Sequence, residues 1–187
     1  MTDKTEFDYG PLTGLIGTWK GNKGLDIAPD PDGTEENPYY ETIVFEAAGD
    51  VDNAEEQNLT IVRYHQVVSR KSNGEVFHDQ TGYWTWDAAT GVVVQSLTIP
   101  RNMCVLAGGS SSVDSESEAV TLKVAARKGD PDWGIIESPF MRDNASTLAY
   151  EHTLTVDGDR MSYSEVTHLK IYGREFEHTD ENQLVRR

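Results

Sequence analysis

The stretch Gly17-Thr18-Trp19-Lys20-Gly21 stands at the head of a long series of short segments in which apolar and polar residues alternate. Glycines let a backbone turn tightly, so this stretch predicts a sharply bent entry to the first strand. Alternation with period two indicates half-buried β-strands, and no segment keeps the period of a helix for more than a turn or two. The chain is therefore expected to be an all-β protein in which hairpins join successive strands.

Turn-forming residues divide the chain into segments of strand length. Asn73-Gly74 and Asp157-Gly158 are typical of hairpin turns, and residues 29–33 form a loop by their composition. The expected strands begin around Thr18 and continue at residues 39–46, 59–69, 76–87, 92–99, 103–107, 120–126, 146–156, 160–172 and 176–185. Residues 50–57, 108–118 and 128–144 are expected to be connections, and residues 133–136 are a candidate strand within the last of them. About eight to ten short antiparallel strands favour a closed β-barrel over a sandwich.

Length and charge limit the classes of protein and partner. The 187 residues fit one domain, a barrel expected over residues 11–187 after a flexible N-terminal segment, residues 1–10. The 16 basic and 32 acidic residues give a formal charge of −16, which argues against nucleic acid and anionic membrane surfaces as partners. No apolar run approaches the ~20 residues that span a bilayer, and residues 1–9 lack the apolar core of a signal peptide, so a cytoplasmic location is expected. The sequence leaves open whether the barrel is a monomer or a homodimer.

Polar residues fall on strand faces that also carry apolar residues. Because side chains two residues apart share a face, alternation assigns four of the five histidines to the inner wall. Buried polar groups without partners would cost several kcal/mol in total. These side chains therefore either bond to one another or line a cavity that holds a small-molecule ligand. The predicted cavity residues are Arg63, His65, His78, Gln80, Trp84, Arg101, His152 and Tyr163.

Two motifs and one hairpin carry a resemblance to known barrels. The stretch around Trp19 resembles the entry to calycin barrels (lipocalins and fatty-acid-binding proteins), in which an indole plugs one end. The segment Phe77-His78-Asp79-Gln80-Thr81-Gly82-Tyr83 resembles the His-x-x-[Ser/Thr]-Gly-Tyr stretch of the nitrobindin family, the haem-binding barrels also found in certain THAP-type proteins. Residues 156–163 resemble the penultimate hairpin of that family. The correspondence extends from about Leu12 to the C-terminus.

The resemblance implies a ten-stranded antiparallel barrel of calycin type that holds haem b at one open end. It implies His178, near the start of the last strand, as the axial ligand of the iron, with Thr18 and Phe176 beside the cofactor. It also implies that arginines 186 and 187 stack on the plugging indole. The family is credited with binding nitric oxide and isomerising peroxynitrite to nitrate, for which a ferric iron is a suitable Lewis acid. After the histidine, the apolar alternation of the family is replaced here by Thr179-Asp180-Glu181-Asn182-Gln183.

Two other functions remain open at this point. The first is a non-enzymatic carrier of a small amphipathic or fatty-acid-like ligand, whose carboxylate would pair with Arg63 or Arg101. An ion pair between Arg63 and Glu165 inside the barrel is the purely structural alternative for that arginine. The second is an enzyme without haem that uses three histidines as acid–base groups or as ligands of a metal ion. These histidines are His65, His78 and His152.

Overall fold

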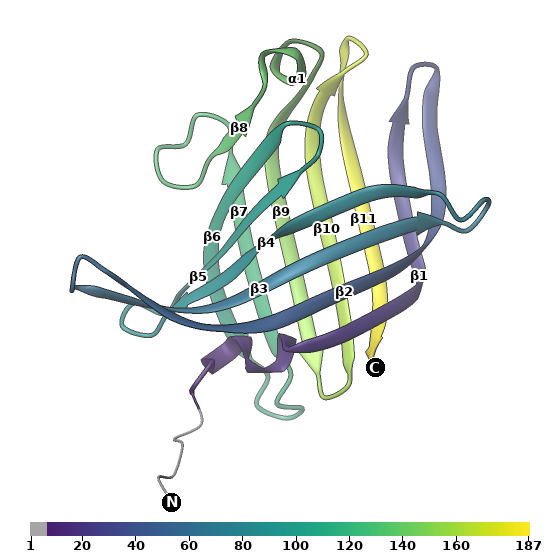
Figure 1. Cartoon of the computed structure of the whole chain (residues 1–187). Helices are drawn as coiled ribbons and strands as arrows, with labels where there is room; N and C mark the ends of the chain where they lie inside the picture. The colour runs from purple at the N-terminus through teal and green to yellow at the C-terminus, as the bar shows by residue number, and fades with distance from the viewer. Residues whose placement is uncertain (1–6) are drawn as a thin grey trace, which may run out of the picture.

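Ten long antiparallel strands close into a barrel in the computed structural model, which describes residues 7–187 (Figure 1). The strands are β1 (Gly17–Asp30), β2 (Gly33–Asn53), β3 (Gln57–Arg70), β4 (Val76–Asp87), β5 (Val92–Ile99), β6 (Met103–Val113), β7 (Val120–Arg127), β9 (Ala145–Asp157), β10 (Arg160–Ile171) and β11 (Arg174–Arg186). Neighbours pair in chain order, β7 pairs with β9, and β1 pairs with β11 to complete the circle. The predicted calycin-like barrel is confirmed.

One end of the barrel is closed by a short 3-10 helix, η1 (Gly10–Leu15), and by the tryptophan of the opening motif. The side chain of Trp19 is fully buried, and its indole N–H donates to the carbonyl of Leu15 at 2.7 Å. The guanidinium of Arg186 lies over the indole, 4.3 Å from its centroid, and also donates to the carbonyl of Gly14. The expected stacking of an arginine on this indole is confirmed for Arg186.

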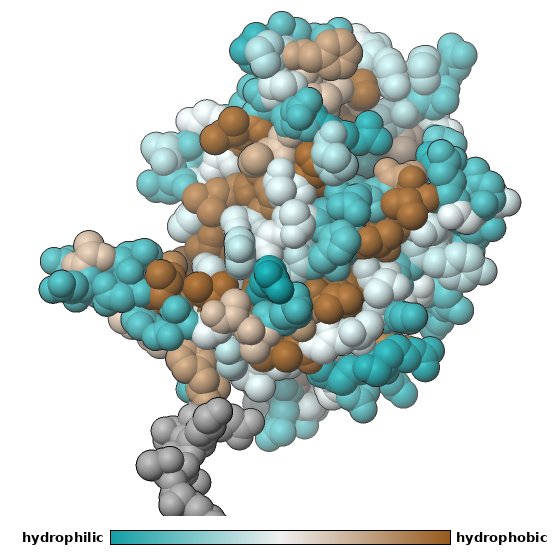
Figure 2. Space-filling view, viewed as in Figure 1, coloured by the Kyte–Doolittle hydropathy of each residue, from teal (hydrophilic) through white to brown (hydrophobic). Residues whose placement is uncertain are grey.

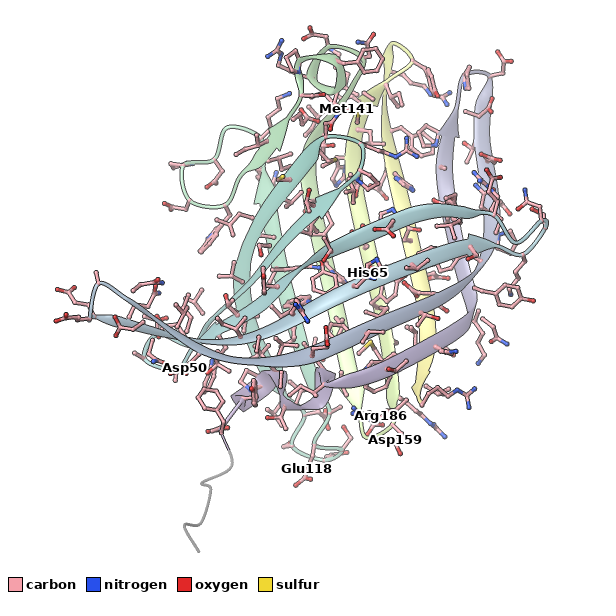
Figure 3. The ribbon with its side chains drawn as sticks, in the orientation of Figure 1. Asp50, His65, Glu118, Met141, Asp159 and Arg186 are labelled. Carbon is pink, nitrogen blue, oxygen red and sulfur yellow. The ribbon has the colours of Figure 1, made fainter. Side chains whose placement is uncertain are left out.

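The opposite end carries a short strand that overlaps the candidate strand at residues 133–136 and a helix that the sequence did not reveal. A three-residue strand, β8 (Ile135–Glu137), pairs with the start of β6, and a short helix, α1 (Pro139–Asn144), follows it. The hydroxyl of Ser138 accepts a hydrogen bond from the amide of Met141 and so caps this helix. Figure 3 shows Met141 at this end and Arg186 at the other. Within residues 7–187, no helix is both long and apolar enough to span a bilayer.

Two segments expected as connections belong in part to strands, and only residues 54–56 and 114–118 form the turns. Strand β2 runs on to Asn53, and its hairpin with β3 projects beyond the barrel, where hydrophilic side chains cover it (Figures 1 and 2). Strand β6 continues to Val113, through Gly108 and Gly109. A Cβ at Gly108 would lie only 2.2 Å from the ring of Trp133, so glycine here lets that indole pack against the barrel wall. The glycines reflect close packing rather than a loop.

The predicted flexible segment, residues 1–10, lies mostly outside the described residues. Where the description begins, the phenol of Tyr9 accepts a hydrogen bond from the amide of Gly49 at 3.0 Å. Gly10 already belongs to η1. The first turn of structure is therefore attached to the barrel before the first strand starts.

The face assignment is wrong for β3. Its inner face carries Val62 and Tyr64, whereas Arg63 and His65 point outward. Arg63 pairs with Glu46 at 2.8 Å, and neither it nor His65 lies inside the barrel. Both faces of this strand carry apolar side chains, and a shift of one residue exchanges them, so alternation alone does not say which face is buried.

A candidate ligand cavity at the open end

Side chains from both halves of the sheet enclose a cavity of about 310 Å³ at the end opposite Trp19. This volume lies at the lower limit of typical small-molecule sites, which are roughly 300–1,000 Å³. Its apolar wall includes Val68, Leu97, Ile99, Met103, Leu169 and Ile171. Its polar wall includes Asp26, His78, Gln80, Arg101, Tyr163, Glu165, His178 and Asp180. The cavity therefore offers an apolar surface to one side of a ligand and ionisable groups to another.

One cluster of ionisable groups joins the first and last strands. Asp26 of β1 lies opposite Asp180 of β11 in the sheet, and His178 is two residues from Asp180 on the same inner face. Nε2 of His178 lies 2.6 Å from a carboxylate oxygen of Asp26 and 3.3 Å from one of Asp180. Burial by itself lowers the pKa of His178, but the hydrogen bond with Asp26 and the charge of Asp180 outweigh it and raise the pKa.

The same cluster is held in place by its neighbours. Asn37 donates to the second carboxylate oxygen of Asp26 at 2.9 Å, and the guanidinium of Arg70 donates to the amide oxygen of Asn37 at 3.3 Å. Burial raises the pKa of the Asp180 carboxyl well above its ordinary value; the charge of His178 lowers it in part, and Glu165 raises it further. Acidic groups therefore outnumber basic groups at this point of the wall.

A second cluster surrounds Glu41, whose side chain is buried. Its carboxylate accepts hydrogen bonds from Gln66 at 2.6 Å, from Asn182 at 2.7 Å and from the phenol of Tyr163 at 3.0 Å. The phenol of Tyr39 lies 2.7 Å from that of Tyr163. Burial raises the pKa of Glu41 from 4.5 to about 7, although the three hydrogen bonds work in the opposite direction. The carboxyl thus titrates near neutral pH.

A third cluster lies deeper, toward the closed end. The phenol of Tyr150 donates to Glu165 at 2.9 Å and lies 3.0 Å from Gln95, which also contacts Nδ1 of His152. Nε2 of His152 is buried and has no hydrogen-bond partner among the described residues. Burial lowers the pKa of His152 to about 4, so this imidazole is neutral at physiological pH. Gln80 continues the network toward the cavity and contacts Nε2 of His78 at 3.2 Å.

The structure separates the predicted site residues into three groups, which lie in the cavity wall, in the packed core and on the outer wall of the barrel. Five of them line the cavity: His78, Gln80, Arg101, Tyr163 and His178. Trp84 and His152 point inward but pack against each other in the core, with ring centroids 5.7 Å apart. The predicted set of three histidines does not come together, because His65 lies on the outer wall and contacts Asp79 (Figure 3).

The two residues expected beside the cofactor are not in the cavity wall. Thr18 lies at the closed end, where it flanks the buried Trp19 and therefore points away from the interior. Phe176 shares the inner face of β11 with His178, but it lies nearer the turn, and the guanidinium of Arg174 stacks on its ring at 5.6 Å. Neither placement follows from alternation alone, since the cavity occupies only one part of the barrel.

Several polar residues of the wall were missed from the sequence. These are Asp26, Asn37, Gln66 and Asp180, and the buried Glu41 that Gln66 contacts was missed as well. The sequence indicated one of them, because Asp180 lies two residues after His178 and therefore shares its face of the strand. Asp26 gave no such signal, because its place opposite Asp180 depends on the pairing of β1 with β11.

The comparisons with known proteins agree with this architecture. The family profile described as "THAP4-like, heme-binding beta-barrel domain" matches residues 8–186. The chain belongs to this family. Among solved structures, the crystal structure of Rv2717c from M. tuberculosis is similar to this chain, with a TM-score of 0.70 over 97% of this chain and 99% of that chain. The sequences are 22% identical, so that likeness concerns the fold alone. No curated protein matches the sequence significantly.

Proposed function

We propose that this THAP4-like barrel binds haem b in its open-end cavity, with His178 as the axial ligand of the iron. The observation that carries the proposal is the position of His178 at the start of β11, on the inner face and in the cavity wall. The family profile over residues 8–186 supports the same cofactor. Neutral imidazole is a good ligand for iron.

Apolar and basic side chains of the cavity wall support the proposal. Leu169 and Ile171 lie on the inner face of β10, beside the strand that carries His178. Arg70 and Arg101 line the same cavity and suit the carboxylates of an anionic cofactor.

One contact must change before His178 can bind iron. Its Nε2 is hydrogen-bonded to Asp26, and Asp180 lies close by. The imidazole must therefore exchange its carboxylate partner for the metal. Asp26 also accepts a hydrogen bond from Asn37, which would hold its carboxylate in the wall after that exchange. A ferric haem held here would supply a Lewis-acidic iron, on which we base the proposal of nitric oxide binding and peroxynitrite isomerisation.

The test is a haemin titration followed by absorbance, on the native chain, His178→Ala and His65→Ala. His65 is the matched control because it lies on the outer wall. We expect a Soret band that saturates at one equivalent in the native chain and in His65→Ala, and its loss in His178→Ala. A titration that does not saturate, or an unchanged band in His178→Ala, would overturn the proposal.

A second candidate is the carriage of a small amphipathic carboxylate without catalysis. Arg101 favours it, because its exposed guanidinium lines the cavity beside the apolar wall. Arg63 does not take part, since it pairs with Glu46 outside the barrel. Fatty-acid titration of the native chain and of Arg101→Leu tests this function: weaker binding by the variant supports the carboxylate contact, and equal binding rejects it.

A further inference from the structure

We propose that Asp26, His178 and Asp180 form a binding site for a divalent transition-metal ion when the cavity holds no haem. The site goes beyond the haem proposal, because it uses two carboxylates in addition to the histidine. The two occupants share His178 and therefore exclude each other.

The ligand geometry is the first argument. The three residues each offer one ligand atom, and these atoms lie within 4.8 Å of one another. Zinc binds imidazole nitrogen and carboxylate oxygen at about 2.0–2.2 Å, so small side-chain rotations bring all three atoms onto one ion. Three protein ligands leave a coordination position open, and His178 and Asp180 both line the cavity from which a fourth ligand could approach.

Rigid support is the second argument. Asp26 and Asp180 are register partners across the β1–β11 pair, so the backbone fixes their separation. Asn37 donates to the carboxylate oxygen of Asp26 that faces away from His178. Arg70 in turn donates to Asn37. Such outer contacts orient the ligands of metal sites and strengthen them.

Charge is the third argument. Asp26 is almost fully buried, Asp180 is largely shielded from solvent, and Glu165 lies near enough to act on Asp180. A single histidine contacts both aspartates. A buried carboxylate is unfavourable unless it is paired or bound to a metal, and a dication would balance two of them at once. A mixed nitrogen and oxygen donor set suits Zn²⁺, Mn²⁺ or Fe²⁺ better than Mg²⁺ or Ca²⁺.

The test uses the metal-free protein of residues 1–187 and the ions Zn²⁺ and Co²⁺ alone. Calorimetry with Zn²⁺ measures stoichiometry and affinity, and Co²⁺ absorbance reports a site with nitrogen and oxygen ligands. Asp180→Asn removes one ligand, and Asp79→Asn is the control, because Asp79 also contacts a histidine but lies on the outer surface. Circular dichroism without metal confirms that each variant folds.

We expect one ion per chain in the native protein and in Asp79→Asn, with binding to Asp180→Asn weaker by about tenfold or more. Equal weakening by Asp79→Asn and Asp180→Asn, or several weak ions per chain, would reject the site in favour of diffuse binding to an acidic surface.

A competition experiment separates this site from the haem proposal. His178→Ala should lose both occupants, whereas Asp180→Asn should lose the cation and retain haemin. Saturation with Zn²⁺ should reduce the uptake of haemin by the native chain. If haemin never binds, the zinc titrations still decide on the cation site. If zinc never binds at one equivalent, the haemin titrations still decide on the proposed function.

Discussion

The two ends of the barrel are built from the same strands but from different kinds of side chain. Strand β1 supplies the buried indole of Trp19 at the closed end and the carboxylate of Asp26 at the other. Strand β11 likewise carries buried Leu184 near the closed end and His178 and Asp180 toward the cavity. Each strand thus changes from apolar packing to polar lining along its length. The closed end therefore maintains the fold, while the open end leaves polar groups available to a ligand.

The largest expected effect is at the closed end. Trp19→Ala removes a fully buried indole, its hydrogen bond to Leu15 and the surface on which Arg186 stacks. We expect the free energy of unfolding to fall by about 3–5 kcal/mol, measured by urea denaturation. Tyr83→Ala, an exposed aromatic on the outer wall, should lower it by less than about 1 kcal/mol. Equal losses would show that the closed end has no special role in stability.

The next effect concerns the pH dependence of stability. The pKa of Glu41 is raised from 4.5 to about 7 by burial, so its neutral form is favoured in the folded state. The stability that this carboxyl contributes is fully present below about pH 4.5 and is lost as the pH rises through about 7, by about 3 kcal/mol in all. Glu41→Gln should therefore flatten the decline in the free energy of unfolding between pH 5 and pH 8.

Urea denaturation at several pH values measures this effect. Glu46→Gln is the control, because Glu46 is exposed and pairs with Arg63 outside the barrel. An equal change in both variants would mean that the decline reflects the overall negative charge, and not the buried carboxyl.

A smaller effect on stability is expected from Arg186, whose guanidinium stacks on the indole of Trp19. Arg186→Ala removes the stacking on Trp19 and the hydrogen bond to the carbonyl of Gly14. We expect a loss of about 1–2 kcal/mol in urea denaturation, with Arg186→Lys recovering part of it. Haemin and zinc titrations should be unchanged, because the site lies at the other end. Weaker ligand binding by Arg186→Ala would contradict the separation of the two ends.

The smallest effect is expected on the outer wall. His65→Ala removes an exposed imidazole that contacts Asp79. Since exposed ion pairs contribute little, thermal or urea denaturation should change by no more than about 0.5 kcal/mol. A loss of several kcal/mol would place this side chain inside the barrel, as alternation first indicated.

Much of the barrel could be predicted because its strands are punctuated by strong turn residues. Alternation placed His78 and Tyr163 on the inner face, since their strands carry a clear apolar face, and it placed His178 there because this residue shares a face with Phe176. It failed for β3, whose two faces are similarly apolar. It also missed α1, because a helix of six residues is too short to show a period.

The polar cluster could be predicted only in part. His178 followed from the resemblance to the family, and the polar residues after it were visible in the sequence. Its contact with Asp26 depends on the pairing of β1 with β11, which joins residues 152 positions apart. Periodicity within one strand carries no information about that pairing. The structure therefore adds to the site the contact between the last strand and the first.

The most direct test of the two-ended account is nuclear magnetic resonance of the protein labelled with ¹⁵N in its five histidines. Zinc protoporphyrin IX, a diamagnetic analogue of haem, and Zn²⁺ alone are titrated in separate experiments. We expect the ring signals of His178 to shift with both ligands, and those of His78 to shift with the porphyrin. The signals of His65 on the outer wall should stay unchanged. Shifts at His65, with none at His178, would show that ligands bind outside the barrel and would contradict the account.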